Sequence, residues 1–171
     1  KMKKSILFLI LLMAAVGICA GSLTAFAKTA DKIKIGISMP TLQEERWKKD
    51  EAMFKERLMK LGVKEKNILI QSANGDEQKQ VSQSENLITQ GVDALIIIPQ
   101  NGEACAPIVK SAHEDGVKVV AVDRIINNPD LDFYVTFDAY EIGVIQGEYI
   151  AKLSQSGNWI MVGGAPTDPN A

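Results

Sequence analysis

Short runs of β-branched and other apolar residues alternate with longer amphipathic stretches along most of the chain. Four strands are predicted, at residues 33–37, 68–70, 94–98 and 117–122. Between them, apolar side chains recur at helical spacing, which predicts helices at residues 42–61, about 77–90 and about 103–115. A glycine follows each of these helices, as is typical of a helix end. The strand at 94–98 is apolar throughout, which indicates a strand covered on both faces.

The first of these helices carries a sequence signal for its start. Thr41 and Glu44 have the spacing of a capping box, in which two side chains bind the free backbone N–H groups at a helix N-terminus. We therefore expect this helix to begin at Thr41 and to stop before Gly62.

The order of strands and helices is typical of one fold class. Strands that alternate with helices through short connections predict a parallel sheet with helices on both faces, which is a three-layer α/β/α domain. A short strand at 134–136, a helix at 139–153 and a strand at 159–162 are predicted to follow. A sheet of this kind needs a covering helix after its last strand, and the sequence ends at Ala171, so we expect the second α/β unit to be truncated.

The first 27 residues have the composition of a targeting sequence. Three lysines lie within the first four positions, residues 6–18 are almost entirely apolar, and residues 25–27 (AFA) form a small-x-small cleavage site. This pattern predicts a signal peptide at 1–27, and therefore export to the periplasm or the cell surface. Cys19 lies within it, but Ile18 is not the small residue that usually precedes a lipid-attachment cysteine.

Charge and cysteine content argue against several kinds of partner and site. Beyond residue 27 the chain has 16 Lys and Arg against 21 Asp and Glu, so its surface is mildly acidic. Such a charge disfavours nucleic acid and anionic membranes as partners. Cys105 is then the only cysteine, so we expect no disulfide and no cysteine metal site, and we interpret Cys105 as a half-buried helical residue.

Candidate chemistry gathers in the loops after the strands, because ligands of open parallel sheets bind beyond the carboxyl ends of the strands. The polar and aromatic residues there are Arg46, Trp47, Asn74, Gln100, Asn101, Asp123, Arg124, Asp168 and Asn170. Sugar hydroxyls both donate and accept hydrogen bonds, so carboxylate, guanidinium and amide groups suit them. An indole can also lie against the apolar face of a sugar ring. Trp47, Asp123, Arg124 and Asn170 therefore predict a sugar site.

These residues also have structural interpretations that stay open at this point. Trp47 can be a core residue, Arg46 a salt-bridged helix residue and Asn170 a turn residue. No motif indicates catalysis or nucleotide binding: residues 38–43 contain no glycine, and neither a phosphate loop nor a nucleophile elbow occurs. The only histidine, His113, falls within a helix, where we expect it to be solvated. An enzyme is therefore not expected, and neither a metal nor a cofactor is predicted.

Five strings of the sequence resemble the periplasmic D-xylose-binding proteins, a branch of the ribose/galactose-type sugar-binding family. They are residues 45–50 (ERWKKD), 71–75 (QSANG), 91–102 (GVDALIIIPQNG), 123–134 (DRIINNPDLDFY) and 163–170 (GGAPTDPN). The apolar strand type is shared by the whole family. The pair Arg46-Trp47 and the last string are more specific to the xylose branch.

The resemblance implies a type I periplasmic-binding-protein fold, in which two similar lobes close on one sugar. It implies a first lobe at 28–137, a crossover near Phe137 and Asp138, and the incomplete start of a second lobe at 138–171. The ligand-binding residues that it implies are Arg46, Trp47, Asp123, Arg124, Asp168 and Asn170. The implied ligand is D-xylose or a similar monosaccharide, and the implied partners are the membrane permease of an ABC transporter and its separate ATPase.

Two further functions use a related core. An exported sugar sensor would pass its signal to a membrane histidine kinase or a chemoreceptor, and its sequence would look the same in the regions discussed above. An intracellular sugar-responsive repressor would need an N-terminal helix-turn-helix, where this chain has the predicted signal peptide.

Overall fold

The computed structural model describes residues 28–154, 156–164 and 170. Its strands are β1 (Ile35–Met39), β2 (Ile68–Ser72), β3 (Ala94–Ile97), β4 (Lys118–Val122) and β5 (Phe133–Val135). Its helices are α2 (Glu45–Lys60), α3 (Glu77–Thr89), α4 (Ala106–Glu114) and α5 (Ala139–Leu153), with single 3-10 turns η1 (Ala30–Lys32) and η2 (Glu65–Asn67). The predicted signal peptide lies outside the described residues.

The strands form one sheet in the order β2-β1-β3-β4-β5, and every neighbouring pair is parallel. The chain first builds outward from β1 to β2 and then crosses to the other side of β1, where β3 and the later strands follow. The strand order therefore reverses between β1 and β3. Such a switch point separates the loops at the carboxyl edge of a sheet and leaves a crevice between them.

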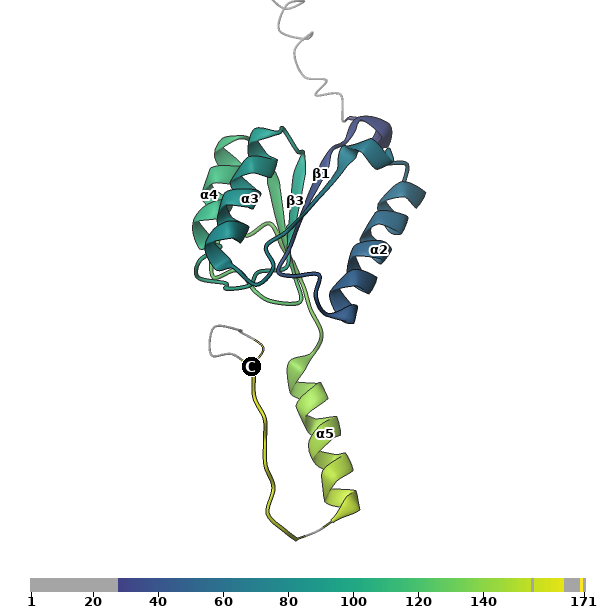
Figure 1. The fold of residues 1–171 in the computed structure, drawn as a ribbon, viewed down its shortest axis with the longest axis vertical. Coiled ribbons are helices and arrows are strands. Elements are labelled where there is room, and N and C mark those ends of the chain that lie inside the picture. Colours follow the sequence, from purple (N-terminus) through teal and green to yellow (C-terminus); the bar gives the residue numbers. More distant parts are fainter. Residues whose placement is uncertain (1–27, 155, 165–169, 171) are drawn as a thin grey trace, which may run out of the picture.

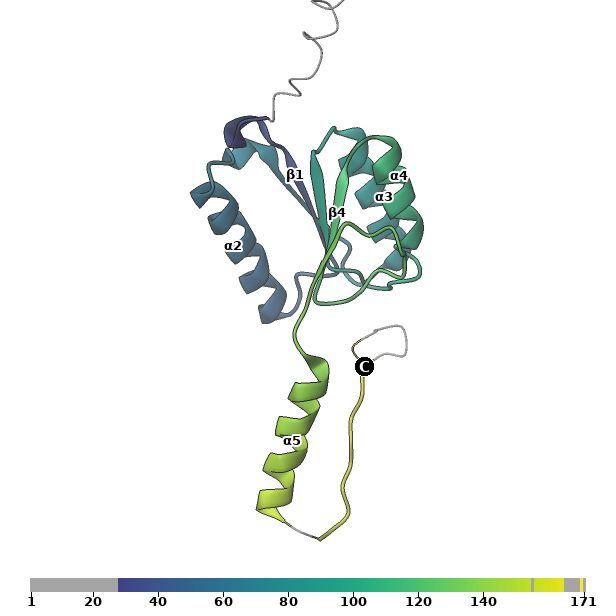
Figure 2. The same ribbon diagram turned by 180° about the vertical axis from the view of Figure 1, so that it is seen from behind.

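Helices cover both faces of this sheet. Figure 1 shows α2 on one face and α3 with α4 on the other, and Figure 2 shows the same three layers from behind. The predicted three-layer α/β/α fold is therefore confirmed. Both views also show α5 leading away from the sheet. Within the part of the chain that the structure describes, no helix is both long enough and apolar enough to cross a membrane.

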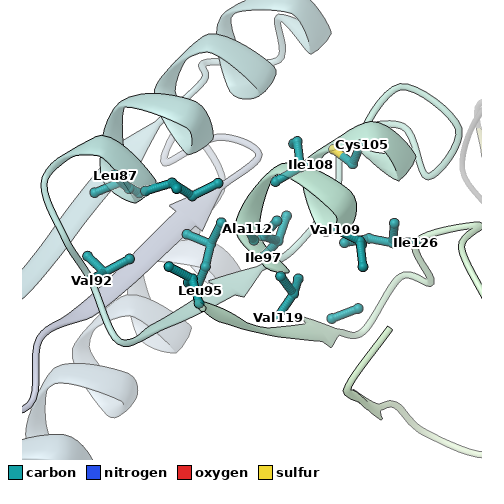
Figure 3. Packing of buried hydrophobic residues seen from close by; sticks show 13 residues of the cluster. Leu87, Val92, Leu95, Ile97, Cys105, Ile108, Val109, Ala112, Val119 and Ile126 are labelled. Atoms are coloured by element: carbon teal, nitrogen blue, oxygen red, sulfur yellow. The ribbon is translucent and has the colours of Figure 1, made fainter. Parts of the chain in front are cut away.

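Two apolar clusters hold the layers together. The larger lies between the sheet and the helices α3 and α4, and its side chains interdigitate (Figure 3). Its members are Leu87, Ile88, Val92, Leu95, Ile97, Cys105, Ile108, Val109, Ala112, Val117, Val119, Ala121 and Ile126. The smaller lies under α2 and includes Ile37, Met39 and Trp47. Strand β3 contributes side chains to both clusters, so the centre of the sheet is covered by apolar residues on both faces.

The helix starts differ from the prediction. The helix expected from Thr41 begins only at Glu45, because the hydroxyl oxygen of Thr41 accepts a hydrogen bond from the Gln43 backbone N–H (3.0 Å) and so closes a turn instead of a capping box. The end is as expected: Gly62 adopts φ +95°, a conformation that favours glycine.

The helix expected from residue 103 begins at Ala106. The side-chain oxygen of Asn101 accepts bonds from the backbone N–H groups of Glu103 and Ala104, which holds this stretch as a turn. Cys105 precedes the helix and is buried rather than half-buried, with 1% of its surface exposed. Burial, together with the nearby Glu77 carboxylate, raises the pKa of Cys105 to about 12, so its thiol stays protonated.

The strand predicted at 159–162 is absent from the structure. These residues are in extended coil, and Ile160, Met161 and Val162 are at least 90% exposed. A strand requires a neighbour that supplies hydrogen bonds, and no described segment pairs with this stretch. The apolar run at 159–162 is thus not sufficient for a strand here.

Candidate functional site

The residues predicted to bind ligand lie at the carboxyl edge of the sheet. Arg46 and Trp47 are in the first turn of α2, which follows the β1 loop, and Asp123 and Arg124 directly follow β4. Because all strands are parallel, these segments end on the same edge although 77 residues separate Arg46 from Asp123. The structure therefore brings these four predicted residues together at one edge of the sheet.

Asp123 is the central residue of this group. Its backbone has φ +65°, in the left-handed region that Asp tolerates better than most residues. Its N–H donates to the Val135 carbonyl (2.8 Å), and its own carbonyl accepts from the hydroxyls of Tyr134 (3.0 Å) and Thr136 (2.7 Å). The chain thus reverses at the end of β4 and points the carboxylate back toward α2.

An ion pair links α2 to the end of β4. A terminal nitrogen of Arg46 (Nη2) donates to Oδ1 of Asp123 at 2.7 Å, and its Nε lies 3.8 Å from a carboxylate oxygen of Asp50 one turn further along α2. The Asp123 side chain is 10% exposed whereas that of Arg46 is 52% exposed. The acceptor is therefore held in place by the fold, and the donor remains accessible to a ligand.

Trp47 takes a different position from the one its predicted role suggests. It is 5% exposed and packs in the cluster under α2 with Ile37 and Met39. The guanidinium carbon of Arg46 lies 4.5 Å from the centroid of its ring, and that of Arg124 lies 5.6 Å away. Such cation–π contacts orient both cations. In this structure Trp47 is a core residue that supports two arginines, and the role as a stacking surface for sugar stays a prediction.

Arg124 bridges two strand-end loops. Its Nη1 donates to the Pro99 carbonyl at 3.3 Å, in the loop after β3, while its guanidinium reaches the Trp47 ring after β1. This single side chain therefore connects the ends of β1, β3 and β4 across the switch point.

Asn170 reaches the same group from the far end of the chain. Its amide donates to the Asp123 carbonyl at 3.1 Å. The bond brings the side chain to the site edge, where it was predicted to act. Asp168 lies outside the described residues, so its predicted role stays a prediction.

Three other residues in the loops after the strands, Asn74, Gln100 and Asn101, make hydrogen bonds to neighbouring residues of the sheet domain. Asn74 adopts φ 58° and accepts a bond from the Ser72 hydroxyl, as a turn residue does. The Asn101 amide donates to Glu77 at 3.0 Å, and the Gln100 backbone N–H donates to the buried side chain of Gln80 at 2.7 Å. These residues shape the loops.

The sequence did not identify the residues whose hydrogen bonds hold the loops of the site in place. Gln80 on α3 is fully buried, and it also donates to the Ile98 carbonyl at 2.9 Å, so it fixes the loop after β3. Tyr134 and Thr136 hold the Asp123 carbonyl. The period of two along a strand puts Tyr134 and Thr136 on one side, but nothing in the sequence says that Asp123 lies opposite them.

The single histidine belongs to the opposite edge of the sheet. His113 Nε2 lies 2.6 Å from Oδ2 of Asp132, so the expectation that it is simply solvated is wrong. Oδ1 of Asp132 accepts from Lys118 (2.7 Å), and Oδ2 also accepts from the Val119 backbone N–H (2.9 Å). Burial raises the pKa of Asp132, but the bonds from Lys118, Val119 and His113 outweigh it and hold this pKa well below its usual range.

A cavity of about 660 Å³ opens beside the ion pair, between α2, the β4–β5 edge and the start of α5. Its walls are mainly apolar, from Met53, Phe54, Val122, Val135, Phe137 and Ile142. Its polar lining comes from Arg46, Asp50, Arg57, Asp123 and Thr136. A hydroxyl-rich ligand suits the ion pair and not these apolar walls. The chemistry therefore places the candidate site at the polar edge near the switch point.

Comparison with known proteins assigns the family. The model of the periplasmic binding protein domain matches residues 35–171. The chain belongs to this family. It is 44% identical over 153 residues to the D-xylose-binding periplasmic protein of Haemophilus influenzae, covering 88% of this chain and 45% of that protein. It is also 44% identical over 149 residues to the protein of the same name of Escherichia coli, covering 87% and 44%.

A solved structure agrees with this assignment. The carbohydrate transporter solute-binding protein of Chloroflexus aurantiacus, determined in complex with D-glucose, superposes with a TM-score of 0.71 at 36% identity, covering 81% of this chain and 41% of that chain. The resemblance to D-xylose-binding periplasmic proteins and the fold class predicted from the sequence are thereby confirmed. The chain spans less than half the length of these relatives.

Proposed function

We propose that this protein binds D-xylose, or a closely similar monosaccharide, as the extracytoplasmic substrate-binding component of an ABC importer, and that it is not an enzyme. The single observation that carries the proposal is the Arg46–Asp123 pair at the carboxyl edge of the sheet, with Arg124 beside it. The similarity to two D-xylose-binding periplasmic proteins supports the choice of sugar.

The chemistry of the pair suits vicinal hydroxyl groups. Oδ1 of Asp123 already accepts from Arg46, whereas no described residue donates to Oδ2, so a sugar hydroxyl can donate there. Arg46 and Arg124 have several N–H donors each, which can bind the oxygen of the same hydroxyl or of its neighbour. The low exposure of Asp123 strengthens such bonds, because water screens them less than at an open surface.

The two-lobe arrangement is part of the proposal. Residues 28–137 would form the first lobe and residues 138–171 would begin the second, with Asp168 and Asn170 on the opposite wall. The bond from Asn170 to the Asp123 carbonyl supports this, because it joins a residue of the proposed second lobe to the centre of the first-lobe site. The lobes would close on the sugar by hinge bending, and the closed form would dock on a membrane permease driven by a separate ATPase.

Calorimetry with the complete gene product tests the sugar and the site together. We expect D-xylose to bind, and Asp123→Asn to weaken that binding at least tenfold. Asparagine keeps the size of the side chain and tolerates the left-handed backbone, so the loss reports the charge. Asp130→Asn is the matched control, because Asp130 is exposed in the same loop.

Two outcomes would contradict the proposal. Absence of D-xylose binding with tight binding of another compound class would refute the sugar. Unchanged affinity in Asp123→Asn would refute the site assignment while leaving sugar binding intact.

A further inference from the structure

Residues 134–136, at the end of β5, make hydrogen bonds to both the backbone N–H and the carbonyl of Asp123. The Tyr134 hydroxyl and the Thr136 hydroxyl donate to the Asp123 carbonyl, at 3.0 and 2.7 Å. The carbonyl of Val135, which lies between them, accepts from the Asp123 N–H at 2.8 Å. Alternate side chains of a strand point to the same side, which is why residues 134 and 136 reach one acceptor together.

The backbone of Asp123 needs such support. A φ of +65° is unfavourable for a residue other than glycine, and it persists only where surrounding contacts define it. The residue is 7% exposed, so the folded protein would be less stable if the Asp123 carbonyl accepted no hydrogen bond. In addition to the Asn170 amide, the two hydroxyls donate to that carbonyl from the β5 side, and they thereby fix the direction in which the chain leaves β4.

The direction of the backbone sets the direction of the carboxylate. With the left-handed turn in place, Oδ1 of Asp123 meets Arg46 at 2.7 Å on the neighbouring helix. A rotation at φ of residue 123 would swing the side chain away from α2. Neither hydroxyl lies in the ion pair itself, so their influence on it passes through the main chain.

We infer that Tyr134 and Thr136 are positioning residues of the sugar site, which hold the main chain of Asp123 so that its carboxylate faces Arg46 and the ligand. The inference rests on the proposed function, because it assigns the ligand to the Asp123 carboxylate. It adds two residues of β5 and its end to a site otherwise built from α2, the loop after β4 and the distant segment at Asn170.

The first arm of the test measures sugar affinity in the complete gene product. Thr136→Val removes one hydroxyl at nearly constant shape, and Tyr134→Phe removes the other but keeps the ring. We expect D-xylose affinity to fall about tenfold in the double variant, and Thr136→Ser, which restores a hydroxyl, to recover most of what Thr136→Val loses. Thr89→Val is the matched control, because the Thr89 hydroxyl bonds only within α3, to the Glu85 carbonyl.

The second arm needs no sugar. Amide hydrogen exchange by NMR in the ligand-free protein should show the Asp123 N–H exchanging at least tenfold faster in the Y134F/T136V variant than in the wild type, with amides of β1 unchanged. A protein that binds no sugar but shows this local loosening would refute the proposed function and keep the positioning role. Unchanged exchange of Asp123, or an affinity loss that Thr136→Ser does not recover, would overturn the inference.

Discussion

The loop at residues 123–132 has an aspartate at each end, and the two are held in opposite ways. Asp123 stands at the carboxyl edge of the sheet, where one carboxylate oxygen pairs with Arg46 and the main chain carries most of the other bonds. Asp132 stands at the opposite edge, where both carboxylate oxygens accept from protein donors. A carboxylate saturated by its own protein stabilises the fold, whereas one with accepting capacity left can serve a ligand.

This difference explains why the same residue type has two roles within ten positions. Asp132 ties the end of the loop to the start of β4 and the end of α4, through Val119 and His113. That anchor lies away from the candidate site. The Asp132 contacts therefore fix one end of the loop and leave the Asp123 carboxylate at the other end available to a ligand.

The largest effect should come from neutralising the first aspartate. In Asp123→Asn we expect D-xylose affinity to fall about 100-fold, or about 2.8 kcal/mol, because a charged acceptor is lost. The free energy of unfolding should change by less than about 1 kcal/mol, since the backbone bonds of residue 123 remain. Calorimetry and urea denaturation measure the two quantities. A large loss of stability with little loss of affinity would show that Asp123 stabilises the fold and does not bind the ligand.

The same substitution at the other end should act on stability. Asp132→Asn is expected to lower the free energy of unfolding by about 2 kcal/mol, because it weakens bonds from Lys118, His113 and the Val119 N–H that are partly shielded from solvent. Urea denaturation provides the value, and sugar affinity should stay within about twofold of the wild type. Asp130→Asn serves as the control for loss of a charge in this loop. Equal losses of affinity at 123 and 132 would show that the two ends are not independent.

The contribution of Asp132 to stability should appear in how the free energy of unfolding depends on acid pH. The pKa of Asp132 is lowered in the folded protein, so the unfolded chain takes up the proton first as the pH falls. The stability that Asp132 contributes is thus fully present above its unfolded pKa of about 4 and is lost as the pH falls below that value toward the lowered folded pKa. Unfolding free energies of the wild type should therefore decrease more steeply below about pH 4 than those of Asp132→Asn. Parallel acid profiles for the two proteins would contradict this.

The smallest effect is expected for the exposed partner of Asp132. The Lys118 side chain is 70% exposed, so its pair with Asp132 is screened by water. Lys118→Met should change the free energy of unfolding by less than about 1 kcal/mol, which the same denaturation experiment can resolve. A loss as large as that of Asp132→Asn would mean that Lys118, and not the Val119 and His113 contacts, carries the anchor.

Much of the fold could be predicted, because it depends on local periodicity. The apolar run at 94–98 and the amphipathic stretch at 77–90 correspond to β3 and α3 within a residue or two at each end. The expected strand at 159–162 failed because pairing depends on a neighbour and not on the run itself. The prediction that α2 begins at Thr41 was wrong because the Thr41 hydroxyl accepts a hydrogen bond from the Gln43 N–H instead of capping the helix.

The candidate site was predictable as a set and not as an arrangement. Parallel topology alone places the strand-end residues Arg46, Asp123 and Arg124 on one edge, so the sequence and a simple rule were sufficient to select them. That Arg46 pairs with Asp123 across 77 residues depends on how α2 packs on the sheet. The core position of Trp47 depends on the same packing.

The amino-acid sequence by itself therefore determined the order of elements, the parallel sheet and the edge on which chemistry gathers, because hydrophobic period and loop length act within a few residues. Only the tertiary structure decided which aspartate is saturated and which retains accepting capacity. That distinction depends on donors from α4, β4 and α2 that meet one loop in space. Long-range contacts of this kind leave no periodic trace in the sequence, and so Asp123 and Asp132 differ in role although they are the same residue.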